Sequence, residues 1–377
     1  MPRRRLLLEV AALAAQSVSY SAIVDILLRK EDKMSGKIRF LGLVTILVLL
    51  GAVLLIGASG WAQKASVAKP PKPPVPPPPP ADPAIAYVVN NYSGAAMKRT
   101  KGQLMVMNAD GSNQQVVLTE TGVEYGFPDW SPDGTQLVFT RNNIVGGDSG
   151  IYIININGTG FRKVVNFRFG DSYCYPVTWS PMPLADTNYK IAFTDSVRRP
   201  DGTYEIDHAA FIVNLDGTGL VQLTNPLESG AQIYWSPEAD EVTFPAIDPE
   251  TGRMGFGVYT INYVAETETF SITPRLICGE FPWGIWAYHQ DKLALGHNND
   301  IWICDISTND PFLSNQVTFT PTAGEWIMSW SPDDLKILFV QLSGGGLYTI
   351  NSDGSGGLVQ ISSEDFTWRS PRWRRNL

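Results

Sequence analysis

A tryptophan recurs six times in the later part of this chain, each time beside a short apolar run. In four of the six copies the tryptophan is followed by Ser-Pro. The copies are spaced by 49, 56, 51, 44 and 43 residues. They are Trp130, Trp179, Trp235, Trp286, Trp330 and Trp373. A recurring period of this length indicates a repeat architecture, in which each unit buries its apolar face against its neighbours.

The segments between the tryptophans predict four strands in each repeat. Runs such as "GIYIININGTG" and "GLYTINSDGSG" are rich in β-branched and aromatic residues and end in Asn-Gly or Asp-Gly turn signals. A short last strand such as "LVQLT" follows them. The runs "LVFT" and "IAFT" are almost continuously apolar, which is typical of a sheet covered on both faces. Repeats of this kind predict an all-β fold, a β-propeller.

The two ends of the repeat region predict how the propeller closes. The last copy, "SPRWRR", contains only a first strand, whereas "AIAYVVNN", "QLMVMNADGSN" and "QVVLT" supply second, third and fourth strands without a first. Together they complete one blade. We therefore expect a six-bladed β-propeller over residues 84–377, closed when the C-terminal strand joins the N-terminal strands, which removes the open sheet edges.

The repeat also resembles that of a known family. The pattern P-x-W-S-P-D-G, followed by a strand, a hairpin such as "IYIININGTG" and then "LT", is similar to the TolB-type six-bladed propeller repeat over residues 84–377. The Gly-His and Trp-Asp dipeptides of WD40 repeats are missing. The resemblance implies a protein-interaction module. It covers the propeller only, because TolB has an α/β domain where this chain has an apolar and a proline-rich segment.

The residues before the propeller predict a membrane anchor. Residues 38–60 are expected to form a single transmembrane helix, because residues 40–58 hold 19 residues without a charge or proline, roughly 28 Å as a helix. Residues 1–37 are basic, so the positive-inside rule puts them in the cytoplasm and the propeller outside it, in the periplasm or the extracellular space. The helix is either an uncleaved signal anchor or a signal peptide whose removal would make the propeller secreted. Residues 1–33 are either a cytoplasmic tail or a start-site artefact before Met34.

Residues 61–83 predict a proline-rich spacer. Its core, "KPPKPPVPPPPPADP" at 69–83, favours stiff polyproline II helix, which at about 3.1 Å per residue would hold the propeller some 40 Å from the membrane. A ligand for a proline-binding module is the alternative interpretation.

Charge and cysteine content limit the classes of partner. Residues 84–377 carry 18 Lys/Arg and 32 Asp/Glu, a net charge of −14, with no basic stripe. Such a surface repels phosphate backbones, so we expect no nucleic-acid binding. Three cysteines are too few for a disulfide framework.

Acidic and aromatic side chains precede most of the repeated tryptophans. Six blades around one axis would bring these lead-in loops together at one mouth of the channel. A ring of carboxylates would raise pKa values and attract a cation, and the aromatic rings would add apolar and cation–π contacts. The candidate binding residues are Glu124, Tyr125, Asp171, Tyr173, Glu228, Glu280, Trp283, Glu325, Trp326, Asp365 and Trp368.

This mouth predicts a membrane-anchored envelope module that binds a basic protein or an extended peptide. A divalent cation such as Ca²⁺ would screen the ring, and no other cofactor is expected. In a different interpretation the acids cap turns and the aromatic residues pack between blades. Two further functions stay open: a propeller hydrolase or lyase acting on a small sugar or lactone in the channel, and a structural part of an envelope complex.

The motifs that resemble catalytic or metal sites are weak. His208 and His297 are expected in loops between second and third strands, whereas His289 should face the opposite end, which disfavours a three-histidine metal centre. "GGDSGI" at 146–151 lacks the strand-to-helix setting of a nucleophilic serine. The Asp/Asn-Gly-Ser/Thr sequences at 110, 157, 216 and 353 lack the later glutamate of an EF-type calcium loop, so we expect them to be turns.

Overall fold

The computed structural model describes the propeller region of the chain. The described residues are 84–375 except 94–97, 144–147, 168–175, 199–205, 225–231, 248–253, 265–266, 268, 279–283, 308–313, 321–323 and 367–368. The segment 1–37, the helix expected at 38–60 and the spacer 61–83 lie outside these residues. The described part contains strands and connections but no helix, and therefore no helix able to cross a membrane.

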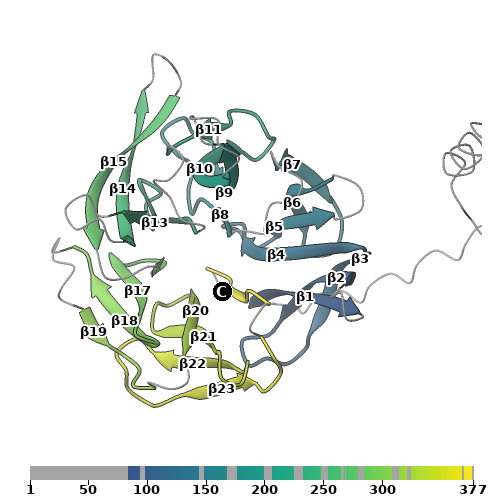
Figure 1. Cartoon of the computed structure of the whole chain (residues 1–377), viewed down its shortest axis with the longest axis vertical. Coiled ribbons are helices and arrows are strands. Elements are labelled where there is room, and N and C mark those ends of the chain that lie inside the picture. Colours follow the sequence, from purple (N-terminus) through teal and green to yellow (C-terminus); the bar gives the residue numbers. More distant parts are fainter. Residues whose placement is uncertain are drawn as a thin grey trace, which may run out of the picture. The chain divides into compact units, whose positions relative to one another are not determined.

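The described strands form six four-stranded antiparallel sheets arranged in a ring, as the repeats predicted (Figure 1). Blade 1 contains β24 (Arg372–Trp373), β1 (Ile85–Ser93), β2 (Lys98–Met107) and β3 (Gln115–Thr121); blade 2 contains β4 (Val123–Trp130), β5 (Gln136–Asn143), β6 (Gly150–Asn155) and β7 (Arg162–Asn166); blade 3 contains β8 (Val177–Trp179), β9 (Lys190–Arg198), β10 (Ile206–Asn214) and β11 (Val221–Gln222). Blade 4 contains β12 (Tyr234–Trp235), β13 (Glu241–Ile247), β14 (Met254–Val264) and β15 (Thr269–Cys278); blade 5 contains β16 (Gly284–Trp286), β17 (Lys292–His297), β18 (Asp300–Asp305) and β19 (Ser314–Gln316); blade 6 contains β20 (Glu325–Trp330), β21 (Lys336–Gln341), β22 (Leu347–Asn351) and β23 (Val359–Ser362).

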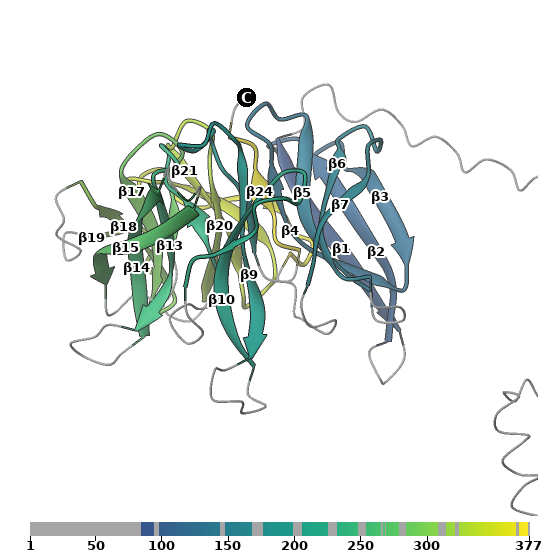
Figure 2. The same ribbon diagram turned by 90° about the horizontal axis from the view of Figure 1, so that it is seen from above.

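The antiparallel order gives the ring two different ends. The turns between first and second strands, and between third and fourth strands, lie at one end, which we call the turn face. The connections between second and third strands, and from each blade to the next, lie at the other end, which we call the mouth face. Figure 2 shows the strands running between the two ends.

Blade 1 is completed by both ends of the propeller sequence, as predicted. Trp373 of β24 pairs with Ile85 of β1, and Arg372 pairs with Ala86. The backbone N–H of Arg374 adds a hydrogen bond of 2.8 Å to the carbonyl oxygen of Ala84. The C-terminal strand lies beside the axis of the ring in Figure 1.

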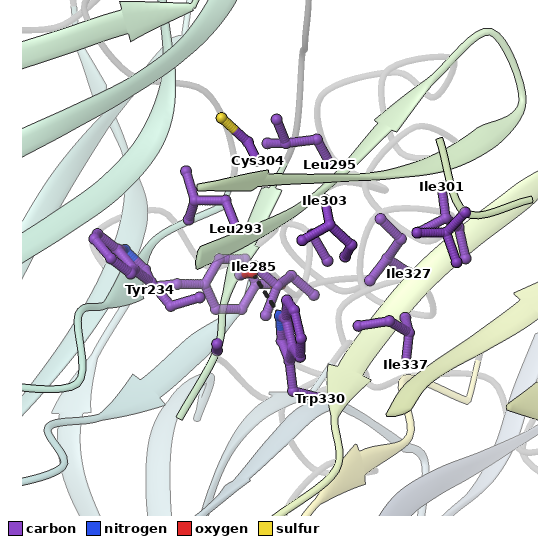
Figure 3. Packing of buried hydrophobic residues seen from close by; sticks show 14 of the residues in the cluster. Tyr234, Ile285, Leu293, Leu295, Ile301, Ile303, Cys304, Ile327, Trp330 and Ile337 are labelled. Carbon is purple, nitrogen blue, oxygen red and sulfur yellow. Dashed lines mark hydrogen bonds between the residues drawn. The ribbon is translucent and has the colours of Figure 1, made fainter. Parts of the chain in front are cut away.

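The repeated tryptophans hold neighbouring blades together. All six are buried, and three donate an indole N–H to the backbone of the first strand in the preceding blade. Trp330 bonds the carbonyl oxygen of Ile285 at 2.9 Å, across the joint between blades 5 and 6 (Figure 3). Trp130 bonds Arg372 in the same way at 3.1 Å, and Trp235 bonds Thr178 at 3.3 Å. The repeated tryptophans therefore act as packing anchors between blades.

The four Asp/Asn-Gly-Ser/Thr sequences are turns between third and fourth strands. In the turn of blade 3, Asp216 Oδ1 accepts hydrogen bonds from both the backbone N–H and the hydroxyl of Thr218. Gly217 has φ +87°, and a side chain there would collide with the carbonyl oxygen of Val164 in blade 2. The conformation and the close approach both require glycine.

Candidate binding site at the mouth face

All six blades converge on one buried ion pair at the turn-face end of the axis. Arg372 of blade 1 donates Nε–H to Asp129 of blade 2 at 3.0 Å, and both side chains are less than a tenth exposed. The second oxygen of Asp129 accepts the backbone N–H of Trp179 in blade 3. Arg372 also donates to the carbonyl oxygen of Met328 in blade 6. The pair thereby fixes four blades relative to one another.

Two buried tyrosines bring blades 4 and 5 into the same cluster. The Arg372 guanidinium lies 5.2 Å from the ring centroid of Tyr234 and 5.9 Å from that of Tyr288. The Tyr288 hydroxyl donates to the carbonyl oxygen of Trp373 at 2.8 Å, and Arg375 covers its ring at 5.0 Å. We call Asp129, Tyr234, Tyr288, Arg372 and Arg375 the hub.

Burial controls the ionisation of the hub. It raises the pKa of Tyr234 to about 12, so this residue stays neutral. Burial lowers the pKa of Arg375, against the opposing effect of the Asp129 carboxylate. Burial also works against the charge of Arg372, but Tyr288 and Asp129 outweigh it and raise the pKa of that guanidinium.

The hub closes the axis at the turn face. Each of its side chains is less than a tenth exposed, and together they come from blades 1, 2, 4 and 5. The turn-face end of the axis is therefore occupied by side chains of the protein itself.

Three predicted binding residues lie at the mouth end of described elements. Glu124 is the second residue of β4 and is half-buried, and Trp326 in β20 is also half-buried. Asp365 is exposed in the connection from β23 to β24. These side chains come from blade 2, from blade 6 and from the connection between blades 6 and 1.

Tyr125 does not face the mouth but is buried in blade 2. Its ring, 1% exposed, packs edge-on against Phe139 at 5.3 Å between centroids. Its hydroxyl donates to Glu120 at 2.6 Å, and Glu120 also forms a bidentate pair with Arg141 at 2.8 and 2.9 Å. Its burial and these contacts place Tyr125 in the core formed by blades 1 and 2.

Glu325 is likewise buried, in the joint between blades 5 and 6. The residue is 7% exposed. Its carboxylate accepts hydrogen bonds from the hydroxyls of Thr318 and Thr320, the latter at 2.7 Å. Thr318 also contacts Asp300, at 3.4 Å. Burial raises the pKa of Glu325, and the Asp300 carboxylate adds to this, although the threonine hydroxyls oppose it.

The raised pKa of Glu325 predicts a pH dependence of stability. Between the ordinary glutamate pKa of 4.5 and the raised value, the folded chain binds a proton that the unfolded chain has released. The contribution of Glu325 to the free energy of unfolding therefore falls as the pH rises through this window. Glu325→Gln cannot titrate, so its stability relative to the native chain should increase over the same pH range. Urea unfolding of both chains at several pH values tests this, with exposed Glu238→Gln as control, and a difference that is independent of pH would contradict it.

Sequence patterns did not identify two apolar side chains at the mouth end of blade 6. Phe319, which lies next to Thr318, is 74% exposed, and Leu342 at the end of the β21 hairpin arm is 49% exposed. Phe319 belongs to the "VTFT" copy of the last-strand motif, where the phenylalanine departs from the "LT" pattern. This departure from the repeat was the sequence signal that could have identified Phe319. We call Phe319, Trp326, Leu342 and Asp365 the blade 6 mouth patch.

The remaining predicted mouth residues lie outside the described part of the chain. They are Asp171, Tyr173, Glu228, Glu280, Trp283 and Trp368. Within the described residues, no three His, Cys, Asp or Glu side chains are grouped in a way that could hold a metal ion.

Comparison with protein families identifies the fold family. The PD40 TolB β-propeller domain matches residues 82–377. The chain belongs to this family. Its TolB-like propeller therefore accounts for all the described strands, and the resemblance seen in the repeated W-S-P-D-G pattern is confirmed.

Solved structures of other proteins share the TolB-like propeller. TolB from Acinetobacter baumannii is 19% identical, with a TM-score of 0.58 over 78% of this chain and 66% of its own. Hydrazine synthase from Kuenenia stuttgartiensis is 12% identical, with a TM-score of 0.54 over 80% of this chain and 48% of its own. A chain of a nidogen/laminin complex is 9% identical, with a TM-score of 0.52 over 78% of this chain and 100% of its own. No curated protein matches by sequence. At these identities the likeness shows the fold, and this chain spans just under two thirds of that TolB.

Proposed function

We propose that this protein is a binding module of the cell envelope, which holds a basic protein or peptide at the mouth face. The buried hub is the observation that carries the proposal, because it fills the turn-face end of the axis with the protein's own side chains and so favours the mouth face for a partner. Exposed Phe319 and Asp365 lie at that end and offer an apolar contact and a negative charge. Aromatic anchors beside charged residues are typical of protein-binding surfaces.

Charge and fold family support a protein partner. The net charge of −14 over residues 84–377 favours a basic segment and steers its approach. Membership of the TolB β-propeller family supports the same class of function. The apolar segment at 38–60 and the proline-rich spacer at 61–83 would hold the propeller outside the cytoplasm, tethered to the membrane. A cation at the lead-in acids other than the buried Glu325 would belong to the same site.

The test is a capture experiment with the full chain, from detergent-solubilised envelope. The mouth variant carries Phe319→Ser and Asp365→Lys, which remove the exposed ring and reverse the charge. Glu238→Lys, an exposed acid on the turn face, makes the same charge change at the other end of the ring. All three chains must first unfold at similar temperatures.

We expect the native chain and the Glu238→Lys variant to retain the same partner, and the mouth variant to lose it. Retention should also weaken as salt is added, because exposed charge pairs are screened. If the mouth variant retains the same proteins as the native chain, the mouth is not the binding surface. Loss of the partner by the Glu238→Lys variant alone would place binding on the turn face.

A further inference from the structure

A cavity of about 250 Å³ opens on the turn face between blades 3 and 4. Asp186 and Asn188 line it from the connection between β8 and β9, Lys190 lines it from the start of β9, and Asn214 lines it from the end of β10. Tyr263 of β14 and Phe270 of β15 form the wall that belongs to blade 4. Blades 3 and 4 are neighbours in the ring (Figure 1). The cavity is separate from the mouth face, since every lining residue lies at the opposite end of its blade.

The cavity lies where two adjacent blades depart from the repeat. In blades 2, 4, 5 and 6 five residues connect the first strand to the second, as in the segment 131–135, but blade 3 uses ten, 180–189. In blade 4 the third and fourth strands have 11 and 10 residues and pair as far as Val264 and Thr269, whereas β6 and β7 of blade 2 have 6 and 5. The longer turn and the longer hairpin supply half of the lining residues, Asp186, Asn188, Tyr263 and Phe270. Closing the ring does not require either of them, because the other blades close without them.

The position of Lys190 shows what the extra segments add. In blade 2 the same position is Gln136, whose amide donates to Asn155 Oδ1 at 2.8 Å and so supports the neighbouring turn. Lys190 donates in the same way to Asn214 Oδ1, but its ammonium group also pairs with Asp186 and lies 5.0 Å from the ring centroid of Phe270. Its side chain is only 3% exposed. Burial of an ammonium and a carboxylate costs free energy, and a neutral amide already supports the turn in blade 2.

The polar groups of the cavity are arranged as a neutral set. Burial alone would raise the pKa of Asp186, but hydrogen bonds from Lys190 and Asn188 hold that pKa below its ordinary value, so the pair is ionised and carries no net charge. Neither an anion nor a cation gains from such a site. The side-chain oxygen of Asn188 and the hydroxyl of Tyr263 have no hydrogen-bond partner among the described residues, which leaves both available to a ligand.

We propose that this cavity binds a neutral, hydroxyl-rich ligand of monosaccharide size. Hydroxyl groups both donate and accept, so they suit a wall that combines a carboxylate, two amides and a phenol. The C–H face of a sugar ring packs on aromatic surface, which half-buried Tyr263 provides, with the buried ring of Phe270 behind it at 4.8 Å between centroids. The volume lies just below the roughly 300–1,000 Å³ of sites for drug-sized ligands, so it suits one ring.

The test measures binding of free monosaccharides to the full chain by saturation-transfer NMR and calorimetry, in a detergent without sugar groups. The probes are D-glucose, D-galactose and N-acetyl-D-glucosamine, with glucuronate and glucosamine as charged comparators. We expect at least one neutral probe to bind, and the matching charged sugars to bind at least tenfold more weakly. Tyr263→Ala and, separately, Asn188→Ala should each weaken binding at least tenfold. Leu335→Ala, an exposed residue in the five-residue turn of blade 6, should leave it unchanged.

Tyr263→Ala and Asn188→Ala are tested separately so that a folding defect in one does not prevent the test. Asn188 is exposed and supports no strand, so its variant should fold even if Tyr263→Ala does not. The proposal is overturned if no neutral sugar binds the native chain, if charged sugars bind equally well, or if binding survives the folded variants. Capture of a protein at the mouth face would be unaffected by any of these outcomes, since the two sites lie at opposite ends of the ring.

Discussion

A chain that ends at Pro371 is expected to lose the folded propeller. It would lack β24, and with it the pairing to Ile85 and Ala86 and the backbone acceptor of the Trp130 indole. Loss of a buried tryptophan costs about 3–5 kcal/mol. The buried carboxylate of Asp129, left without Arg372, costs about 3–5 kcal/mol more. Their sum approaches or exceeds the about 5–15 kcal/mol by which a domain is usually stable, so the truncated chain should be largely unfolded.

Circular dichroism and thermal unfolding of the full-length chain and of the chain that ends at Pro371 would measure this effect. A chain that ends at Arg375 is the matched control, because it keeps β24, the hub and the hydrogen bond from Arg374 to Ala84. The control should unfold at the native temperature. A cooperative transition of native midpoint in the chain that ends at Pro371 would show that the ring closes without its last strand.

Asp129→Ala should be the most destabilising single substitution of a charged residue among the described ones. It leaves the Arg372 guanidinium buried beside Tyr234 and Tyr288 without its carboxylate, which costs about 3–5 kcal/mol. The double substitution Asp129→Ala with Arg372→Met removes both charges and should recover part of this loss. Asp148→Ala, which removes a half-exposed partner of Lys163, should cost about 0–1 kcal/mol.

Urea unfolding of the native chain, Asp129→Ala, Arg372→Met and the double variant, fitted with one common slope, gives four free energies of unfolding and hence the coupling between Asp129 and Arg372. A single substitution at Asp129 that costs no more than Asp148→Ala would mean that water or another group replaces the lost carboxylate. The hub would then not be the element that seals the axis.

Much of the fold was predictable because each repeat contains its own local sequence signals. The tryptophan period, the Asp-Gly turns and the missing first strand at the beginning of the propeller each depend on a few adjacent residues, and each was confirmed. The hub was not predictable in this way. Arg372 and Asp129 are separated by 243 positions in the chain, and neither belongs to a sequence motif that predicts its contact with the other.

The candidate site was less predictable for a geometric reason. Successive side chains on a strand point to opposite faces, so an acid that precedes a tryptophan by a few residues can face either neighbouring blade or the mouth. A register shift between Ile327 and Ser329 in β20, and another between Gly126 and Asp129 in β4, further change this alternation. Glu325 and Tyr125 therefore point into the protein, whereas Glu124 and Trp326 remain half-buried at the mouth end.

The pairing of β24 with β1 also determines when the protein can become stable during its synthesis. β1 pairs with β2 early, but its other edge meets β24 only after almost the entire propeller has left the ribosome, and joining such distant segments makes folding slow. Until then β1 exposes an unpaired edge that invites aggregation and proteolysis. A premature stop codon close to the end of the reading frame would therefore be expected to yield a substrate for proteases, and not a slightly shorter working protein.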